Sequence, residues 1–257
     1  MTRGATRRGT PIVAATGQTD AVSAESGRKV PADGGREAAR RLFPEHWAGL
    51  SAYADLLAGP AVERGLLGPR EVPRLWDRHL VNCAVVADLE VGLVPSGSSV
   101  IDVGSGAGLP GLVWALVRPD LQLTLVDPLL RRSTFLAEAV AELGLQDRVH
   151  VIRGRAEELV GERTVPVVTA RAVAPLDRLL SWTFPLLAPE GVVLALKGAN
   201  AEAEISAAET SLRRLGAAAR VVECGAGVAD PPARVVVVER RTAGSTARAV
   251  PTRRLPR

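Results

Sequence analysis

The stretch Ile101-Asp102-Val103-Gly104-Ser105-Gly106-Ala107-Gly108-Leu109-Pro110-Gly111 opens with apolar residues and combines one acid with four glycines. Glycine tolerates backbone conformations that other residues avoid, and its missing side chain lets a ligand approach the backbone closely. A second acid, Asp127, stands nineteen residues after Gly108, at the end of the next apolar run. That position suits a carboxylate that accepts hydrogen bonds from ribose hydroxyls. The pattern therefore predicts a nucleotide-like ligand above a glycine-rich turn.

Short apolar runs alternate with helical patterns on both sides of this loop. Strands are expected at 98–103, 121–126, 149–153, 165–169 and 191–196, with a closing pair at 221–224 and 234–239. Helices are expected from the loop to about residue 116 and at 133–143, 176–187 and 201–215, with Ser133 as a helix N-cap. This alternation predicts an α/β protein with a mostly parallel, doubly wound sheet. Its ligand crevice should lie at the carboxyl ends of the strands.

The composition divides the chain into four segments. Residues 1–35 are rich in Gly, Ala, Thr, Ser and Pro and are expected to form a disordered tail. Residues 36–92 are expected to form an N-terminal helical extension, with helices at about 36–59 and 71–90. Residues 93–241 hold the alternating pattern and form the ligand-binding domain. Residues 242–257 are expected to be a basic, disordered C-terminal tail.

Composition also excludes several classes of protein. The chain has 257 residues and a net charge of +4, and its longest stretch without a charged residue is the fifteen residues 103–117. A membrane-spanning helix needs about 18 apolar residues, and no apolar segment of a secretory signal follows the basic N-terminus. The two cysteines, Cys83 and Cys224, stand far apart and in no metal-ligand spacing. We therefore expect a cytoplasmic protein with no membrane partner and no bound metal.

Two ligands fit the loop and Asp127 together, a dinucleotide and S-adenosyl-L-methionine. Residues 106–111 match the pattern G-x-G-x-x-G, which alone is a weak indication of a dinucleotide. Asp102, however, stands two residues before Gly104, where its carboxylate would repel a pyrophosphate. A carboxylate there suits the sulfonium and ammonium groups of S-adenosyl-L-methionine. The order of residues therefore favours a methyl donor over NAD(P).

The same stretch resembles the cofactor loop of the bacterial 16S rRNA guanine-N7 methyltransferases, also called the glucose-inhibited division protein B family. Further segments that resemble the family are 76–80, 118–120, 125–127, 131–136, 155–158, 170–174 and 196–198. The resemblance covers about residues 40–240 and implies a class I Rossmann-like methyltransferase fold over 93–241. The chain departs from the family at Asn82-Cys83, where the family usually has Asp-Ser. Any contribution of that acid to RNA binding is therefore in question here.

The resemblance implies a set of donor-binding residues in and around the loop. They are Asp102, Gly104, Gly106, Gly108, Leu109, Asp127, Ala156, Glu157 and Arg171. Gly104 and Leu109 would line the methionine and adenosine parts of S-adenosyl-L-methionine, and Asp127 would hold its ribose. Ala156 and Glu157 would flank the adenine, because backbone amides can bind its edge and a carboxylate can accept from its amino group.

Basic side chains near the expected crevice are candidates for contact with the methyl acceptor. Arg171 follows the fourth strand, and the resemblance implies contact with cofactor or substrate, a surface salt bridge being the alternative. His79 and Lys197 are further substrate-facing candidates. The candidates for contact with RNA are Arg78, Arg131, Arg132 and Lys197, although each can equally be a solvated surface charge.

Guanine N7 carries an in-plane lone pair, so methyl transfer to it needs no general base. Catalysis should come from in-line positioning of a guanine that is unstacked. With the resemblance, we expect methyl transfer from S-adenosyl-L-methionine to N7 of a guanine in 16S rRNA of the small ribosomal subunit, by a monomer. The alternatives are a methyltransferase of the same fold for another RNA or a small molecule, an NAD(P)-dependent oxidoreductase, and a non-catalytic RNA-binding assembly factor.

Overall fold

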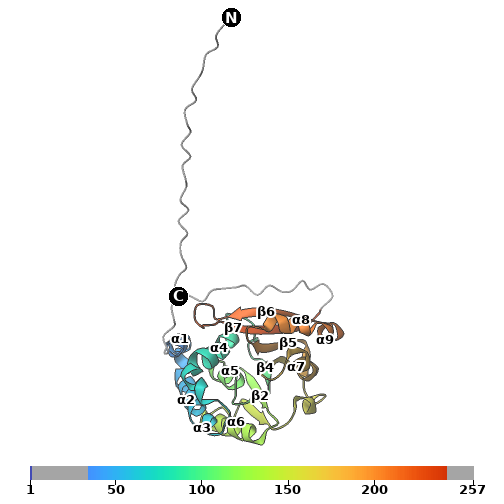
Figure 1. Ribbon diagram of the computed structural model, residues 1–257. Helices are drawn as coiled ribbons and strands as arrows, with labels where there is room; N and C mark the ends of the chain where they lie inside the picture. The colour runs from blue at the N-terminus through green and yellow to red at the C-terminus, as the bar shows by residue number, and fades with distance from the viewer. Residues whose placement is uncertain (2–33, 242–257) are drawn as a thin grey trace.

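The computed structural model describes Met1 and residues 34–241, in which helices cover both faces of one sheet (Figure 1). Residues 2–33 and 242–257, which make up almost all of the two expected tails, lie outside the described residues. Gly34 and Gly35 differ from expectation, because the first helix begins at Gly34 and not at residue 36.

The strands of the described residues form a single sheet in the order β3-β2-β1-β4-β5-β7-β6. They are β1 (Ser99–Val103), β2 (Gln122–Val126), β3 (Val149–Ile152), β4 (Val165–Arg171), β5 (Leu187–Lys197), β6 (Ala217–Cys224) and β7 (Ala233–Arg240). Strands β1 to β5 pair in parallel, and β7 runs antiparallel to both of its neighbours. The expected α/β fold with a mostly parallel, doubly wound sheet is confirmed, including the closing pair of strands. The strand order reverses between β1 and β4, where such sheets bind their ligands.

The helical elements divide between the N-terminal extension and the sheet domain. The α-helices are α1 (Gly34–Leu42), α2 (Trp47–Ala58), α3 (Pro60–Glu63), α4 (Asn82–Ala87), α5 (Gly111–Val117), α6 (Leu130–Glu142), α7 (Leu176–Thr183), α8 (Ala201–Ala207) and α9 (Glu209–Arg214). Short 3-10 helices span Pro44–His46, Pro69–Arg74, Ala156–Leu159 and Phe184–Leu186, and Leu75–Val81 is a π-helix. None of the described helices is long and apolar enough to cross a membrane.

Several helix boundaries differ from expectation. The segment expected as one helix over 71–90 is a 3-10 helix, a π-helix and α4 in succession, and it ends at Ala87. Pro73 inside this segment has no N–H to donate to an α-helical bond. Ser133 is not an N-cap, since α6 begins at Leu130 and the Ser133 hydroxyl donates to the Leu130 carbonyl (3.0 Å). The helix expected over 176–187 ends at Thr183, before a 3-10 turn that contains Pro185.

A further helix differs in the same way. The segment expected as one helix over 201–215 forms two, α8 and α9, with Ala208 between them. The strand expected at 191–196 is longer than its apolar run and begins at Leu187. These differences shift element ends or divide an expected helix into shorter ones, and they leave the order of helical segments and strands along the chain unchanged.

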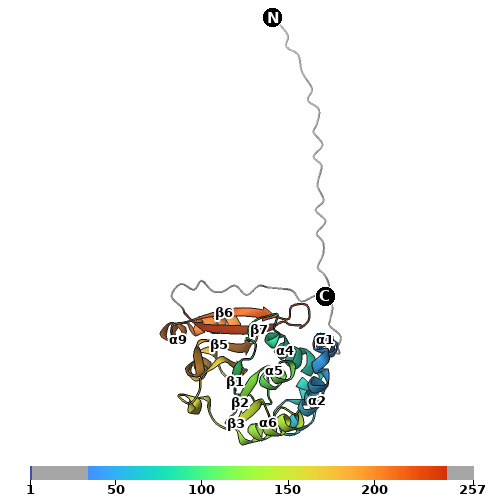
Figure 2. The same ribbon diagram turned by 180° about the vertical axis from the view of Figure 1, so that it is seen from behind.

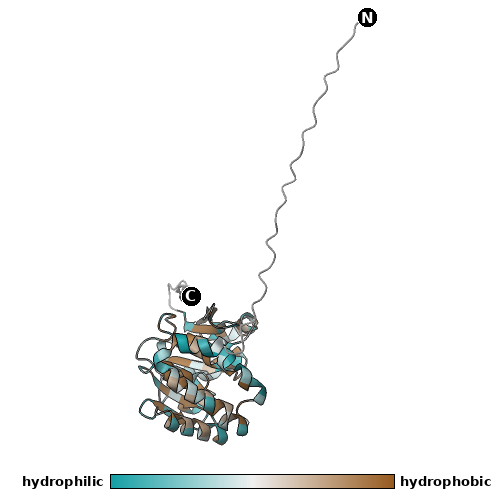
Figure 3. Ribbon diagram, turned by 90° about the vertical axis from the view of Figure 1, so that its left-hand side faces the viewer, coloured by the Kyte–Doolittle hydropathy of each residue, from teal (hydrophilic) through white to brown (hydrophobic). Residues whose placement is uncertain are grey.

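Alternate residues of the central strands pack against different helices. One core contains Val100 and Leu123 together with the extension, α5 and α6, whereas the other contains Ile101 and Val168 together with α7, α8 and α9. The extension runs along one side of the sheet domain (Figures 1 and 2). Its helices, seen from that side in Figure 3, carry hydrophilic and hydrophobic residues in alternation along the ribbon.

Helix α5 lies between the sheet and the extension. Every one of its residues is buried, which agrees with a sequence, Gly-Leu-Val-Trp-Ala-Leu-Val, that is apolar on all sides. The indole N–H of Trp114 donates to the Cys83 carbonyl of α4 (2.9 Å). The extension therefore completes the burial of the helix that follows the glycine loop.

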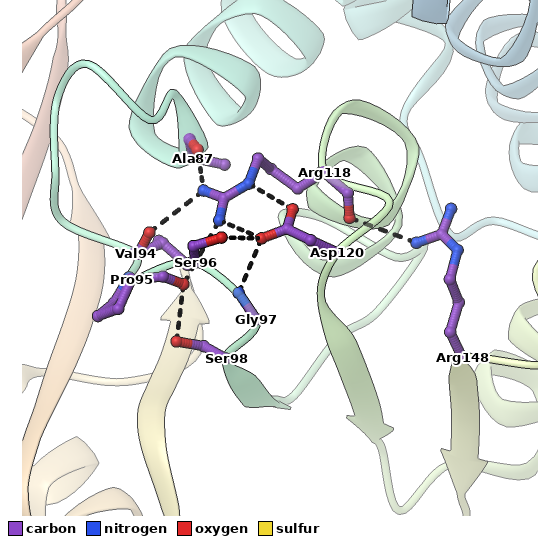
Figure 4. Close-up of polar contacts among 9 residues, drawn as sticks. All are labelled: Ala87, Val94, Pro95, Ser96, Gly97, Ser98, Arg118, Asp120 and Arg148. Atoms are coloured by element: carbon purple, nitrogen blue, oxygen red, sulfur yellow. Dashed lines mark hydrogen bonds and ion pairs between the residues drawn. The ribbon is translucent and has the colours of Figure 1, made fainter.

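The guanidinium of Arg118 fastens the segment between α4 and β1 to the sheet domain (Figure 4). It donates to the carbonyls of Ala87 (2.8 Å) and Val94 (3.2 Å) and, through Nε and Nη2, to the carboxylate of Asp120 (2.8 and 2.7 Å). Its side chain is only 4% exposed, so a buried charge is held by partners on both sides of the junction. Hydrogen bonding to Arg118 also lowers the pKa of Asp120.

Replacing Arg118 by Met should destabilise the protein by about 3–5 kcal/mol, because buried carbonyls and a carboxylate lose their donor. Since Asp120 is partly exposed, we expect the lower end of that range. Urea denaturation followed by circular dichroism measures the change. Arg213→Met, in an exposed pair on α9, is the matched control and should stay within about 0.5 kcal/mol of the wild type. A loss below about 1 kcal/mol for Arg118→Met would contradict the fastening role.

The stabilising charge of Asp120 should disappear in acid. Its pKa in the folded protein lies below the value of the unfolded chain, so its contribution is complete above about pH 4 and is lost as the pH falls further. Between pH 5 and pH 2 the wild type should therefore lose more stability than Asp120→Asn. Equal losses, measured by urea denaturation at each pH, would show that Arg118 does not hold this carboxylate in its charged form.

Candidate active site

Three glycines of the loop after β1 have a backbone conformation that L side chains rarely adopt. Their φ angles are +70° at Gly104, +61° at Gly106 and +100° at Gly108. A Cβ atom at Gly104 would lie 2.8 Å from a methyl group of Val173, and one at Gly108 would lie 2.9 Å from the hydroxyl of Tyr53. Glycine at these two positions is thus required by the backbone angle and by neighbouring side chains together.

Asp102 lies beneath the loop. It is fully buried, and its Oδ2 accepts a hydrogen bond from the backbone N–H of Gly111 (3.0 Å). Burial raises the pKa of this carboxyl group to about 7. Its Oδ1 is also buried and has no hydrogen-bond partner among the described residues. Oδ1 is therefore the oxygen of Asp102 whose acceptor positions are both left for the expected contact with a methyl donor.

Asp127 holds the loop from the end of β2. It is fully buried, its Oδ2 accepts from the backbone N–H of Gly106 (3.1 Å), and its Oδ1 accepts from that of Leu129 (3.0 Å). The guanidinium of Arg132 lies 3.4 Å from Oδ2 and its side chain is 43% exposed, so its expected contact with RNA stays a prediction. A carboxylate has about four acceptor positions, which leaves capacity for a ribose hydroxyl.

The other expected donor-binding residues lie at the ends of neighbouring strands. Leu109 is half-buried in the loop, and the buried Ala156 and the exposed Glu157 begin the 3-10 helix that follows β3. Strands β1, β2 and β3 are adjacent and parallel, so their carboxyl ends share one edge of the sheet. Together with the unpartnered Oδ1 of Asp102, this arrangement fits S-adenosyl-L-methionine, whose parts would follow this edge from the loop to Glu157.

Arg171 ends β4, on the other side of β1 from these residues. Its guanidinium donates to the Sγ of Cys83 (3.2 Å), the carbonyl of Arg78 (3.2 Å) and the Nδ1 of His79. All three acceptors belong to the extension, and none is a carboxylate. Within residues 34–241, Arg171 takes part in no ion pair, so the alternative of a surface salt bridge does not describe it.

Two expected substrate-facing side chains are already engaged. His79 is only 9% exposed, and its ring lies between Arg171 and Glu71, with Nε2 2.8 Å from the Glu71 carboxylate. The π-helix places this ring inside the protein and not on the pocket wall, and the expectation that His79 faces the substrate stays a prediction. Lys197 donates to the Ala174 carbonyl (2.7 Å) and to the Glu204 carboxylate (2.7 Å), so its charge is paired.

A pocket of about 830 Å³ opens beside Arg171. Its walls come from four parts of the chain: Arg78 and Asn82 of the extension, residues 171–175 after β4, residues 196–199 with Glu204 after β5, and Glu223 with residues 231–234 of the β6–β7 hairpin. Val173 lines this pocket and also lies against Gly104. It therefore marks the boundary between the donor loop and the pocket. The described residues hold no cluster of His, Cys, Asp or Glu suited to a metal ion.

Sequence reasoning missed two side chains of the extension that support the site. Tyr53, the single tyrosine of the chain, is fully buried and donates its hydroxyl to the Ala107 carbonyl of the loop (2.7 Å). A buried tyrosine hydroxyl needs a partner, and this requirement was the available signal. Cys83 is buried, and its sulfur accepts a hydrogen bond from the guanidinium of Arg171.

The remaining candidates differ in their surroundings. Arg78 is exposed on the pocket wall, and Arg131 is exposed at the start of α6. Trp76 stacks on Trp47, with ring centroids 5.0 Å apart. This stacking packs Trp76 against the first part of the extension.

Comparison with known proteins adds a family to this geometry. The family model of rRNA small subunit methyltransferase G matches residues 47–230. "Ribosomal RNA small subunit methyltransferase G" of Streptomyces avermitilis is 58% identical over 205 residues, 79% of this chain and 84% of that protein. The protein of the same name from Thermobifida fusca is 52% identical over 229 residues, 89% of this chain and 93% of that protein. A solved putative rRNA methylase from Clostridium thermocellum is 18% identical with a TM-score of 0.46, over 62% of this chain and 94% of its own.

The sheet order, the glycine loop and the two strand-end carboxylates define a Rossmann-like, S-adenosyl-L-methionine-dependent methyltransferase. The match over most of the domain then gives the family. The chain belongs to the rRNA small subunit methyltransferase G family, and the resemblance noted in its sequence is confirmed.

Replacing Gly104 by Ala should weaken binding of S-adenosyl-L-homocysteine at least tenfold, because the new methyl group meets Val173 and strains the loop. Isothermal titration calorimetry measures the affinity. Gly144→Ala is the matched control, since φ is +65° there as well but nothing lies within 4 Å of its Cβ position. The control should share the cost in stability and keep the affinity. Unchanged affinity in Gly104→Ala would remove the loop from the donor site.

Proposed function

We propose that this protein transfers a methyl group from S-adenosyl-L-methionine to N7 of a guanine in 16S rRNA of the small ribosomal subunit. The observation that carries the proposal is the meeting of a donor-type loop and an open pocket at Val173, next to a guanidinium without a carboxylate partner. Membership in a family named for methylation of small-subunit rRNA supports the choice of substrate. We further expect the protein to be cytoplasmic and monomeric.

Positioning is the main task of the protein in this reaction. The bound donor supplies an electrophilic methyl group, and guanine N7 offers a lone pair without losing a proton. The glycine loop, fixed by Asp102 and Asp127, would hold the donor at the ends of β1 and β2. The pocket would hold the base so that N7 approaches the methyl group in line. Such alignment can contribute about 7–11 kcal/mol at its upper limit.

The pocket suits a nucleotide that has left its stack. Val173, Pro231 and Pro232 offer apolar surface for a base, while Arg78 and Arg234 bring positive charge for its phosphates. Arg234 is partly committed, because it pairs with Glu202 and lies 3.4 Å from Glu223. Glu204 is paired with Lys197 and is therefore not a free base. A mechanism without a general base agrees with this set of groups.

The proposed reaction is tested by transfer of labelled methyl groups to small ribosomal subunits and to bare 16S rRNA, both from cells that lack the modification. Chain cleavage at N7-methylguanine then locates the product. Cleavage at one guanine establishes the atom and the substrate together. Absence of transfer to both, while the protein binds S-adenosyl-L-homocysteine, would keep the fold and the cofactor but exclude this acceptor.

Arg171→Ala should lower kcat/KM for methyl transfer about 100-fold, since the pocket loses a fixed guanidinium and with it the alignment of the reactants. Arg213→Ala, on the exposed surface of α9, serves as the control and should behave as the wild type. Thermal unfolding of both variants shows whether they are folded. Wild-type turnover by folded Arg171→Ala would remove this residue from the site.

A further inference from the structure

The contacts of Arg171 are unusual for a charged side chain that is half-buried. Its three acceptors are the thiol of Cys83, a backbone carbonyl and the ring of His79, all neutral groups. A guanidinium has five N–H donors in a rigid fork, so donors remain for a further group. Because Arg171 lines the pocket, its uncompensated charge is available to an oxyanion of a bound reactant.

The hydrogen-bond partners of the His79 ring decide which of its two nitrogens carries the proton. Arginine only donates hydrogen bonds, so Nδ1 must accept from Arg171 and carries no proton. Nε2 then carries the ring proton and donates a hydrogen bond to the carboxylate of Glu71, 2.8 Å away. The imidazole is therefore neutral and links the carboxylate of Glu71 to the guanidinium of Arg171.

The π-helix Leu75–Val81 supplies two of the three contacts with Arg171, the Arg78 carbonyl and the His79 ring. Helices of this kind are rare and are often found at functional sites. Glu71 reaches the same ring from the preceding 3-10 helix. Arg171 is thus fixed from outside its own strand, by a segment almost a hundred residues earlier in the chain.

We propose that His79, oriented by Glu71, is a positioning residue that fixes the guanidinium of Arg171 for an oxyanion of the bound reactants. That oxyanion is either the carboxylate of the methyl donor or a phosphate of the methyl acceptor. The proposal rests on the methyl-transfer function proposed above. His79 acts through Arg171 and does not itself contact a reactant, in agreement with its burial.

Three substitutions of His79 separate positioning from simple packing. In His79→Asn the amide oxygen can take the place of Nδ1 and accept from Arg171. In His79→Gln the amide nitrogen can take the place of Nε2 and donate to Glu71, but nothing accepts from Arg171. We expect kcat/KM to fall about tenfold or more in His79→Ala and His79→Gln, and His79→Asn to restore most of this loss. His150→Ala, at an exposed position on β3, is the control.

The pH profile gives a second readout. The charged groups that face His79 are Glu71, Arg78 of the same helix and Arg171 from β4, and burial and Arg171 lower its pKa. As the pH falls through this lowered pKa, His79 gains a proton, stops accepting and repels Arg171. Wild-type activity should therefore fall in acid, and His79→Asn should lack this part of the decline. Protonation of Asp102, near Arg171, contributes equally to both proteins, so their difference belongs to His79.

Two binding measurements identify the oxyanion. If Arg171 binds the donor carboxylate, His79→Ala weakens S-adenosyl-L-homocysteine binding about tenfold. If it binds an acceptor phosphate, that affinity stays unchanged and the KM for small subunits rises. Wild-type values of both quantities, with wild-type kcat, in folded His79→Ala and His79→Gln would overturn the proposal. So would a folded His79→Asn as inactive as His79→Ala.

A last measurement is independent of turnover. The chain has three histidines, and their titration can be followed by nuclear magnetic resonance. Arg171→Ala removes the cation from Nδ1, so the pKa of His79 should rise. An unchanged pKa would overturn the contact on which the proposal stands. Lack of methyl transfer by the wild type would count against the proposed function alone, because this titration does not depend on the acceptor.

Discussion

Two buried carboxylates that must be satisfied by one loop are the constraint on which the rest of this structure depends. Asp102 and Asp127 end neighbouring strands, and both are fully buried. A buried carboxylate needs hydrogen-bond donors, and the loop backbone supplies them through Gly111 and Gly106. A Cβ atom at Gly111 would lie 2.7 Å from the Asp102 carboxylate, so the loop can approach this closely only as glycine.

The same constraint gives the extension its role. Gly111, the first residue of α5, donates its N–H to Asp102, so α5 begins against the sheet. All of its residues are buried. One continuous hydrophobic core joins Leu50 and Tyr53 of the extension to Leu112 and Leu123 of the sheet domain. Hydrogen bonds of the site also join the extension to the sheet domain, from Tyr53 to the loop and between Arg171 and both Cys83 and His79. The division of the chain at residue 92 stays a prediction from composition, but the site draws on both sides of it.

The basic side chains around the pocket differ in whether a carboxylate of the protein already pairs with their charge. Lys197 is paired with Glu204 and Arg132 with Asp127, so both mainly support the protein. Arg171 has only neutral partners and keeps its charge for a ligand. This contrast separates Arg171 from the basic residues whose charge is paired with a carboxylate. It also agrees with a reaction that depends on alignment and requires no proton transfer from the acceptor.

The sequence by itself determined the α/β fold and the position of the glycine loop, because these depend on local apolar runs and glycine conformation. It predicted Asp102 and Asp127 as donor-site residues from their places beside the loop, and Arg171 from the family resemblance. It could not determine what each charged side chain meets. Tertiary structure decided that His79 turns away from the pocket, that Lys197 is paired and that Tyr53 supports the loop. Tyr53 and Ala107 are 54 residues apart, Lys197 and Glu204 belong to different elements, and His79 stands in a π-helix in place of the expected α-helix. Such pairings arise only when tertiary packing brings the elements that carry these groups together.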